Sequence, residues 1–217
     1  MTVVRRLAQH PAVVAVAGVA WLAVVVVGLW MLMEYDNRPG PAATAPAAWP
    51  ADSAMARDPA GPTLLMLAHP RCDCTRASLT ELAELLARTR TRPRTYVVFI
   101  RPGQVPGGWE DTPLWRRAAG MGGVTVVRDD DGAEARRFGV QTSGQVLVYD
   151  AAGRLQYSGG TTGSRGKSGN NAGRAAILAA LDGGVAPPTS PVFGCPLFAP
   201  TDELMASTEH AHDVNHR

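Results

Sequence analysis

The sequence is poor in the features that mark nucleic-acid-binding proteins and disulfide-stapled proteins. Its 217 residues carry a formal net charge of only +2. The charges are spread without blocks, and no basic stripe with interleaved aromatic residues is present, which argues against a nucleic-acid partner. Lysine is nearly absent, Lys167 being the only one, which we attribute to genome composition. There are three cysteines, and an odd number does not suit a purely structural disulfide framework. At least one cysteine is therefore free, exchanging or metal-bound at some stage.

One long uncharged stretch lies near the N-terminus, over residues 12–33. At about 1.5 Å per residue it reaches about 33 Å, enough to cross a hydrocarbon core of about 30 Å. Arg5 and Arg6 precede it, so the positive-inside rule predicts a cytoplasmic N-terminus and an exported remainder. A signal peptide cleaved at the Ala-rich residues 42–48 is the alternative, but its apolar core is usually only about 7–15 residues long. We therefore predict an uncleaved single-pass anchor in the bacterial cytoplasmic membrane, with the C-terminal domain in the periplasm.

Composition divides the rest of the chain into a linker, a folded domain and a tail. The linker is rich in Pro and Ala and lacks a periodic apolar pattern, so it would hold the domain off the membrane. The tail is polar, and its His210, His212 and His216 indicate a solvated end rather than a metal site. The predicted divisions are 1–11, cytoplasmic N-terminus; 12–33, transmembrane helix; 34–61, Pro/Ala-rich linker; 62–198, folded domain; and 199–217, flexible polar tail.

The folded domain alternates apolar β-like runs with helix-like runs. The early strands alternate with helices and are expected to be parallel, whereas a closing hairpin adds antiparallel strands. A possible capping box, Ser78 to Glu81, falls in the first turn of the first helix. The prediction is a three-layer α/β domain with a mixed sheet. The expected strands are 63–68, 95–100, 124–127, 145–150 and 155–158, and the expected helices are 76–89, 113–119, 133–138 and 171–181.

The most informative motif is Cys72-Asp73-Cys74, which follows the first strand and precedes the first helix of the domain. Backbone N–H groups at a helix start carry partial positive charge and stabilise a thiolate. A thiolate is both the nucleophile of disulfide exchange and a metal ligand. The motif therefore indicates either thiol–disulfide exchange or metal binding.

The sequence alone does not show whether Cys72 and Cys74 bond to each other, to Cys195 or to a metal ion. A Cys72–Cys74 disulfide would be strained inside a regular helix, and strained exposed disulfides exchange readily. Cys195 lies in an apolar segment after the last helix and is either a resolving cysteine for Cys72 or Cys74, or a buried inert thiol. His69, Cys72 and Cys74 also offer soft N and S ligands, and Cys195 could complete a set of four. A static local disulfide is the structural alternative.

The order of elements, with cysteines after the first strand of the domain, resembles the thioredoxin-like superfamily. Residues 62–198 are similar to the family called RedB. The segments that carry this similarity are HPRCDCTRASLTEL, FGVQTSGQVLVYDAAGRLQYSGGTTGSRG and PVFGCPLF. The resemblance implies a thioredoxin-like fold with a redox site at the cysteines. The chain departs from it in two ways: Cys-x-x-Cys is shortened to Cys-x-Cys, and Gly144 stands near the usual cis-proline of the loop that orients a partner chain. Copper-assembly proteins of this fold bind copper through cysteines and a histidine, but their distant histidine has no obvious match here.

We therefore expect a membrane-tethered, exported thiol–disulfide oxidoreductase acting on an exported or membrane protein. Cys72, Cys74 and Cys195 are the expected catalytic residues, and Cys72, earlier in the turn, is expected to be the more exposed thiol. No cofactor is expected. A peroxidase is a sub-case in which Cys195 resolves the oxidised cysteine. The alternatives are a binding or delivery protein for copper or another metal, with His69 and the three cysteines as ligands, and an interaction module without redox activity.

Overall fold

The computed structural model of the chain describes residues 11–41, 44–185 and 187–198. It divides after Arg38 into two compact units. The first contains helix α2 (Pro11–Asn37), which has no buried residue and a mean hydropathy of 2.7 over its most apolar window. By length and composition this helix can cross a membrane, as predicted for residues 12–33, although a signal sequence passes the same test. Arg5, Arg6 and the tail 199–217 lie outside the described residues.

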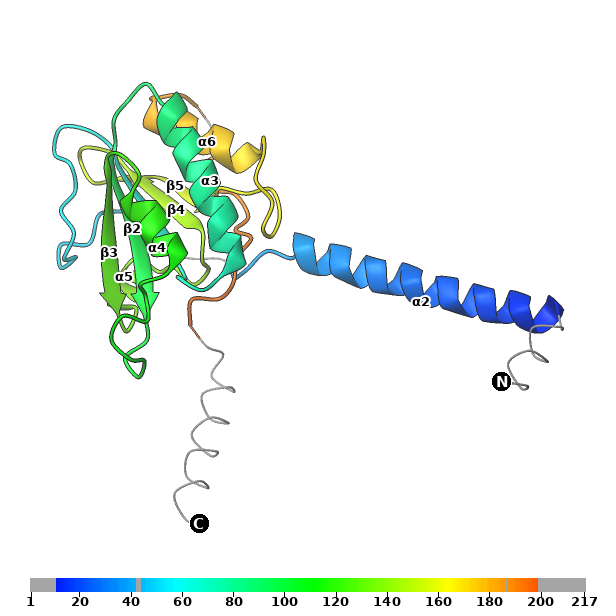
Figure 1. Cartoon of the computed structure of the whole chain (residues 1–217). Helices are drawn as coiled ribbons and strands as arrows, with labels where there is room; N and C mark the ends of the chain where they lie inside the picture. Colours follow the sequence, from blue (N-terminus) through cyan, green and yellow to red (C-terminus); the bar gives the residue numbers. More distant parts are fainter. Residues whose placement is uncertain (1–10, 42–43, 186, 199–217) are drawn as a thin grey trace, which may run out of the picture. The chain divides into compact units, whose positions relative to one another are not determined.

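The second unit is built on a five-stranded mixed sheet with the order β3-β2-β1-β4-β5 (Figure 1). Strands β1, β2 and β3 run parallel, whereas β4 is antiparallel to β1, and β5 is antiparallel to β4. The expected sheet is confirmed, including its closing hairpin. The strands are β1 (Thr63–Ala68), β2 (Arg94–Arg101), β3 (Val124–Asp130), β4 (Gln145–Tyr149) and β5 (Leu155–Gly160).

Helices α3, α4 and α6 cover one face of this sheet, and α5 packs against the other. Successive side chains of β1 point to opposite faces. Leu64 and Met66 therefore join the α3 and α6 side, while Leu65 and Leu67 pack with Phe138 on the other. The predicted three-layer α/β architecture is confirmed. The helices are α3 (Asp73–Arg88), α4 (Pro113–Ala119), α5 (Ala133–Arg137) and α6 (Ala172–Leu181).

Part of the segment predicted as a linker packs on the domain. The Trp49 ring lies edge-on to Phe138 and Tyr149, with centroids 5.1 and 5.3 Å away, and Met55 is only 5% exposed. The Trp49 N–H donates to the carbonyl of Gly153 at 2.7 Å. The folded domain thus begins well before residue 62, because two large apolar side chains anchor a segment whose composition resembles a linker.

The starts of α4 and α5 were predicted correctly and that of α6 to within one residue, but that of α3 was not. Thr112 caps α4 by accepting from the Trp115 N–H, whereas the N-cap of α5 is Gly132. The Asp129 carboxylate, at the end of β3, accepts from the Glu134 and Ala135 N–H groups in the first turn of α5. Helix α3, however, begins at Asp73 rather than Arg76. The predicted capping box is therefore wrong: Ser78 donates to the Cys74 carbonyl within the helix, and Glu81 is completely buried.

Candidate functional site

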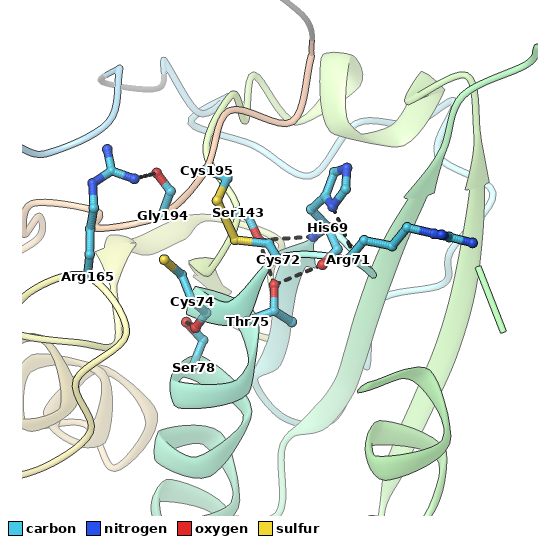
Figure 2. The surroundings of a disulfide bond; sticks show 10 residues. All are labelled: His69, Arg71, Cys72, Cys74, Thr75, Ser78, Ser143, Arg165, Gly194 and Cys195. Carbon is cyan, nitrogen blue, oxygen red and sulfur yellow. Dashed lines mark hydrogen bonds between the residues drawn. A yellow bond between two sulfur atoms is a disulfide. The ribbon is translucent and has the colours of Figure 1, made fainter. Parts of the chain in front are cut away.

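The cysteine motif lies where β1 turns into α3 (Figure 2). Cys72 is the N-cap residue of α3, with extended backbone angles (φ −108°, ψ 124°), and its carbonyl accepts from the Thr75 N–H at 3.0 Å. The Cys72 N–H in turn donates to the His69 carbonyl at 3.3 Å. This tight turn places one sulfur atom at the positive end of a 16-residue helix.

Two hydroxyl groups brace the turn against the loop that precedes β4. The Ser143 hydroxyl accepts from the His69 N–H at 2.9 Å, and the Thr75 hydroxyl donates to the His69 carbonyl at 2.9 Å. The two hydroxyl oxygens lie 3.0 Å apart. The loop at residues 142–144 is therefore fixed beside the cysteine motif, as the resemblance led us to expect.

Gly144 closes this contact in a conformation that favours glycine. Its φ is +87°, and an added Cβ would lie 2.5 Å from the Ser78 hydroxyl oxygen. No cis peptide bond occurs among the residues that the structure describes. The approach of this loop to α3 thus depends on a missing side chain where thioredoxins use proline.

Cys195 is bonded to Cys72, across 123 residues of sequence and with 6.6 Å between the Cα atoms. Its segment runs antiparallel to the loop before β4, with Thr142 and Pro196 forming the paired positions. The Ser143 N–H donates to the Cys195 carbonyl, and the Leu197 N–H donates to the Gln141 carbonyl, both at 2.8 Å. The disulfide therefore fastens this C-terminal segment beside the loop before β4.

Cys74 is a free, partly exposed thiol in the first turn of α3. Its sulfur and those of Cys72 and Cys195 all lie within 4.8 Å of one another. The three cysteines singled out in the sequence are thus brought together, but Cys72 is bonded to Cys195 instead of Cys74. The Cα separation of Cys72 and Cys195, 6.6 Å, falls in the usual range for a disulfide.

The expectation that Cys72 is the more exposed thiol is wrong. Cys72 is only 4% exposed, whereas Cys74 and Cys195 are both partly exposed. The reason is the disulfide, which brings the C-terminal segment onto Cys72.

The basic side chains near the motif are directed elsewhere, with one exception that the sequence did not suggest. The Arg71 guanidinium lies 5.0 Å from the centre of the Trp109 ring and donates to the Trp109 carbonyl, while Arg76 lies 3.7 Å from the Asp73 carboxylate. Arg165, from the Gly-rich loop after β5, instead donates to the Gly194 carbonyl beside Cys195 (Figure 2). No motif connects residues 165 and 194, so only the folded structure reveals this contact.

His69 does not belong to the sulfur cluster. Its Nδ1 accepts from the Arg71 N–H at 3.1 Å, and its ring lies edge-on to Trp109. Burial, assisted by the positive charge of Arg71, lowers the pKa of the imidazole below its usual 6.5. Among the described residues, the group that could hold a metal ion here consists of the three cysteine sulfurs without His69.

Neither a protein-family model nor a curated protein sequence matches this chain significantly, so membership of the RedB family stays a prediction. Solved structures do resemble it. A hypothetical protein from Sinorhizobium meliloti 1021 is 19% identical with a TM-score of 0.53, covering 75% of this chain and 99% of that chain. An uncharacterized conserved protein from Geobacillus kaustophilus is 19% identical with a TM-score of 0.51, covering 76% of this chain and 94% of that chain. At these identities the likeness concerns the fold alone.

A secreted Mycobacterium tuberculosis disulfide oxidoreductase homologous to E. coli DsbE is 21% identical, covering 44% of this chain and 66% of that chain. Its TM-score is 0.32, too low to carry an argument about function. The strand order and directions described above, with the cysteine motif after β1, are those of a thioredoxin-like fold.

Proposed function

We propose that this protein is a membrane-tethered, exported thiol–disulfide oxidoreductase that acts on another exported or membrane protein. The observation that carries the proposal is the grouping of three sulfur atoms within 4.8 Å, two bonded as Cys72–Cys195 and one, on Cys74, free. A disulfide with a neighbouring thiol at a helix start has both components that exchange requires.

The position of Cys72 supports its role as the cysteine that bonds to the partner. In the reduced protein its thiolate, stabilised by the α3 N-terminus, attacks one sulfur of a partner disulfide and releases the other partner sulfur as a thiolate. The Cys195 thiolate then attacks the Cys72 sulfur, restores the Cys72–Cys195 bond and releases the partner. The partner disulfide gains two electrons and becomes two thiols, while the protein dithiol is oxidised. The same steps in reverse oxidise a partner dithiol.

Cys74 offers a second route out of the mixed disulfide. Its sulfur lies within 4.8 Å of the sulfurs of both Cys72 and Cys195. In the mixed disulfide its thiolate can attack the Cys72 sulfur, form a Cys72–Cys74 bond and expel the partner cysteine as a thiolate. In the oxidised protein it can attack the Cys195 sulfur of the Cys72–Cys195 bond and release Cys72 as a thiolate. Three cysteines thus allow the protein to pass one disulfide among alternative pairs.

Helix α2 supports the location in this proposal. A span of this length and hydropathy tethers the domain to one side of a membrane, and a disulfide in the domain suits an oxidising compartment. Sequencing the mature N-terminus of the protein purified from membranes tests the tether: a start beyond residue 40 would contradict an uncleaved anchor.

The catalytic proposal is tested by reduction of insulin disulfides with the reduced, detergent-solubilised full chain, followed as thiol release. Cys72→Ser should abolish the reaction, because it removes the attacking sulfur. Cys195→Ser combined with Cys74→Ser should accumulate the covalent complex with insulin, because both resolving thiols are then absent. Undiminished insulin reduction by Cys72→Ser would exclude the proposed role of this cysteine.

Metal binding is the second candidate function, and the three-sulfur cluster favours it in the reduced protein. Three thiolates within 4.8 Å form a soft ligand set that suits Cu(I) or Zn²⁺. The test is to add one equivalent of Cu(I) to the reduced chain without oxygen and then offer oxidised glutathione. A stable one-to-one complex that forms no disulfide supports metal handling, whereas release of copper as Cys72–Cys195 forms supports exchange.

A further inference from the structure

The segment that carries Cys195 occupies the backbone edge of the loop before β4 as an added strand. The two hydrogen bonds from the Ser143 and Leu197 N–H groups flank the Thr142–Pro196 pair. Thr142 and Pro196 therefore form a non-hydrogen-bonded antiparallel pair, in which the two opposite residues exchange no backbone hydrogen bond. A proline at this position leaves no hydrogen bond unmade. The edge therefore accepts an extended chain with proline directly after the cysteine.

Gly194 lies tightly against the loop before β4. A Cβ added to it would lie 1.9 Å from the Ser143 carbonyl oxygen and 3.3 Å from the Thr142 methyl group. The obstacle is mainly backbone that also donates to the Cys195 carbonyl, so it cannot move aside without breaking that bond. The position before the bonded cysteine thus excludes every side chain.

The segment is also held on either side of the cysteine. Arg165 donates to the Gly194 carbonyl, and Leu197 is 5% exposed within the apolar cluster that includes Leu65 and Phe138. Because Cys72 is buried while this segment is in place, a partner can reach it only after the segment has moved.

We propose that the segment 194–197 is a tethered competitor of the partner, and that the partner binds the same edge as an extended strand with glycine directly before its reactive cysteine. The inference rests on the proposed exchange function and adds its specificity. In the first step the Cys72 thiolate attacks the cysteine of the bound strand, and the leaving sulfur of the partner departs as a thiolate. In the second step the segment returns to the edge, and the Cys195 thiolate attacks Cys72 and expels the partner cysteine as a thiolate.

The test uses the full-length chain in detergent with Cys74→Ser and Cys195→Ser, so that a mixed disulfide on Cys72 persists. One peptide copies residues 192–198, and a second carries alanine in place of the glycine; each is supplied as its disulfide with glutathione. The rate of peptide attachment to Cys72 is measured by mass spectrometry and divided by the rate of the same peptide with dithiothreitol. We expect the glycine peptide to attach roughly tenfold faster, the size expected when two backbone hydrogen bonds are lost with alanine.

A second comparison changes the competitor instead of the peptide. Gly194→Ala in the same chain should displace the protein's own segment and speed attachment of the glycine peptide, again roughly tenfold. Gly122→Ala is the matched control, because an added Cβ there meets nothing within 4 Å, and its rate should be unchanged. Leu197→Ala loosens the segment at its other end and should act in the same direction as Gly194→Ala.

The outcomes separate this inference from the proposed function. Equal attachment of the two peptides, or no acceleration by Gly194→Ala and Leu197→Ala, overturns the competitor while leaving exchange at Cys72 intact. Failure of both peptides to attach to Cys72 in every variant overturns the exchange function itself. Selective attachment of the glycine peptide together with acceleration by both substitutions supports the inference.

Discussion

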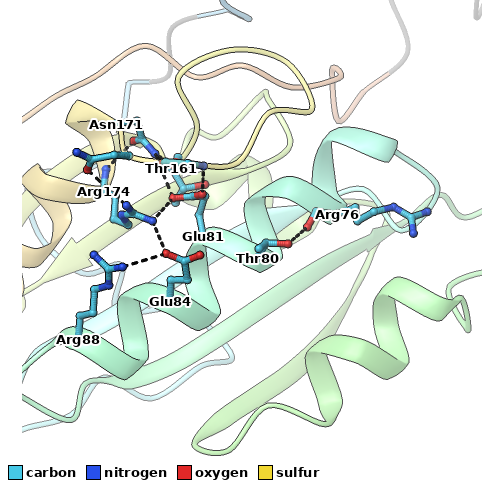
Figure 3. A network of polar contacts seen from close by, with 10 residues as sticks. Arg76, Thr80, Glu81, Glu84, Arg88, Thr161, Asn171 and Arg174 are labelled. Carbon is cyan, nitrogen blue, oxygen red and sulfur yellow. Dashed lines mark hydrogen bonds and ion pairs between the residues drawn. The ribbon is translucent and has the colours of Figure 1, made fainter.

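Helix α3 carries two polar clusters that differ in how firmly they are held. At its start the sulfurs of Cys72 and Cys74 face Cys195 from another segment, and two of the three cysteines are partly exposed. In its middle the completely buried Glu81 accepts from Arg174 at 3.0 Å, from the Gly169 N–H at 2.6 Å and from the Asn171 amide at 3.1 Å (Figure 3).

The difference indicates which cluster is permanent. A buried charge that is paired and fully hydrogen-bonded is costly to disturb, whereas a disulfide beside a free thiol can exchange without unfolding. The two clusters are also connected, because Gly169 belongs to the Gly-rich loop whose Arg165 contacts Gly194. The Glu81 cluster therefore holds the Gly-rich loop, and Arg165 of this loop positions the segment that carries Cys195.

The largest effect is expected from breaking the permanent cluster. Glu81→Ala leaves the buried Arg174 with a single carboxylate partner and should lower the free energy of unfolding by about 3–5 kcal/mol, measured by urea titration of the detergent-solubilised chain. Glu84→Ala is the matched control. Glu84 also contacts Arg174 but its side chain is 44% exposed, so we expect a loss of about 1 kcal/mol or less. Equal losses would contradict the distinction between a buried and an exposed partner.

The Cys72–Cys195 disulfide should contribute somewhat less to the free energy of unfolding than the buried Glu81 does. Cys195→Ser removes a bond that closes a long loop and should cost the oxidised protein about 2–4 kcal/mol. Cys74→Ser leaves the bond intact and should cost about 1 kcal/mol or less. Adding dithiothreitol should bring the unsubstituted chain to the level of Cys195→Ser, and an unfolding midpoint insensitive to the reductant would show that the bond is not accessible to exchange.

A smaller effect is expected at Gly144, which lies close to Ser78 of α3. Gly144→Ala forces a side chain into a positive φ and against the Ser78 hydroxyl, at an expected cost of about 1–3 kcal/mol. Adding Ser78→Ala should recover part of the loss, because it removes the atom that lies 2.5 Å from the new Cβ. If the double variant is no more stable than Gly144→Ala in thermal unfolding, backbone strain alone accounts for the cost.

The smallest effect is a pH dependence at His69. Its pKa is lowered in the folded protein, so the unfolded chain takes up the proton first as the pH falls. The associated stability is complete above the unfolded pKa of 6.5 and is lost as the pH falls through the lower folded pKa. His69→Asn keeps an acceptor for the Arg71 N–H but does not titrate. Between roughly pH 7 and pH 5, a window that spans the usual imidazole pKa, its urea midpoint should therefore fall less than that of the unsubstituted chain. Parallel pH profiles would assign the loss to other groups.

The features predicted from the sequence are those that follow local patterns, and the features missed depend on contacts between distant residues. The strands and helices follow local patterns of apolar residues and caps, such as Thr112 before Pro113. Most of their bounds were predicted to within two residues, but β3 continues to Asp130 instead of ending at residue 127. The start of α3 was missed because Cys72-Asp73-Cys74 has no apolar periodicity. Trp49 and Met55 were assigned to a linker because composition does not reveal which single side chains find a tertiary partner.

The candidate site was predicted as a set of residues but not as a geometry. Position at a strand-to-helix junction singled out Cys72 and Cys74, and the odd count pointed to Cys195. The pairing of Cys72 with Cys195 depends on the contact between the Cys195 segment and residues 141–143. These residues lie about fifty positions before Cys195, and contacts between residues so far apart in sequence leave no local pattern. Arg165 and Ser143 contact the site only through such contacts, so local patterns could not have identified them.

The central claim, that Cys72–Cys195 is an exchangeable couple beside a free Cys74, is tested most directly by a redox titration. The full chain in detergent is equilibrated in glutathione buffers of graded potential, trapped with an alkylating reagent and mapped by mass spectrometry of non-reduced peptides. We expect a reversible change from one free thiol, on Cys74, to three, with Cys72–Cys195 as the disulfide that is lost. A Cys72–Cys195 bond that persists until the protein unfolds, or a Cys72–Cys74 bond as the main oxidised form, would contradict it.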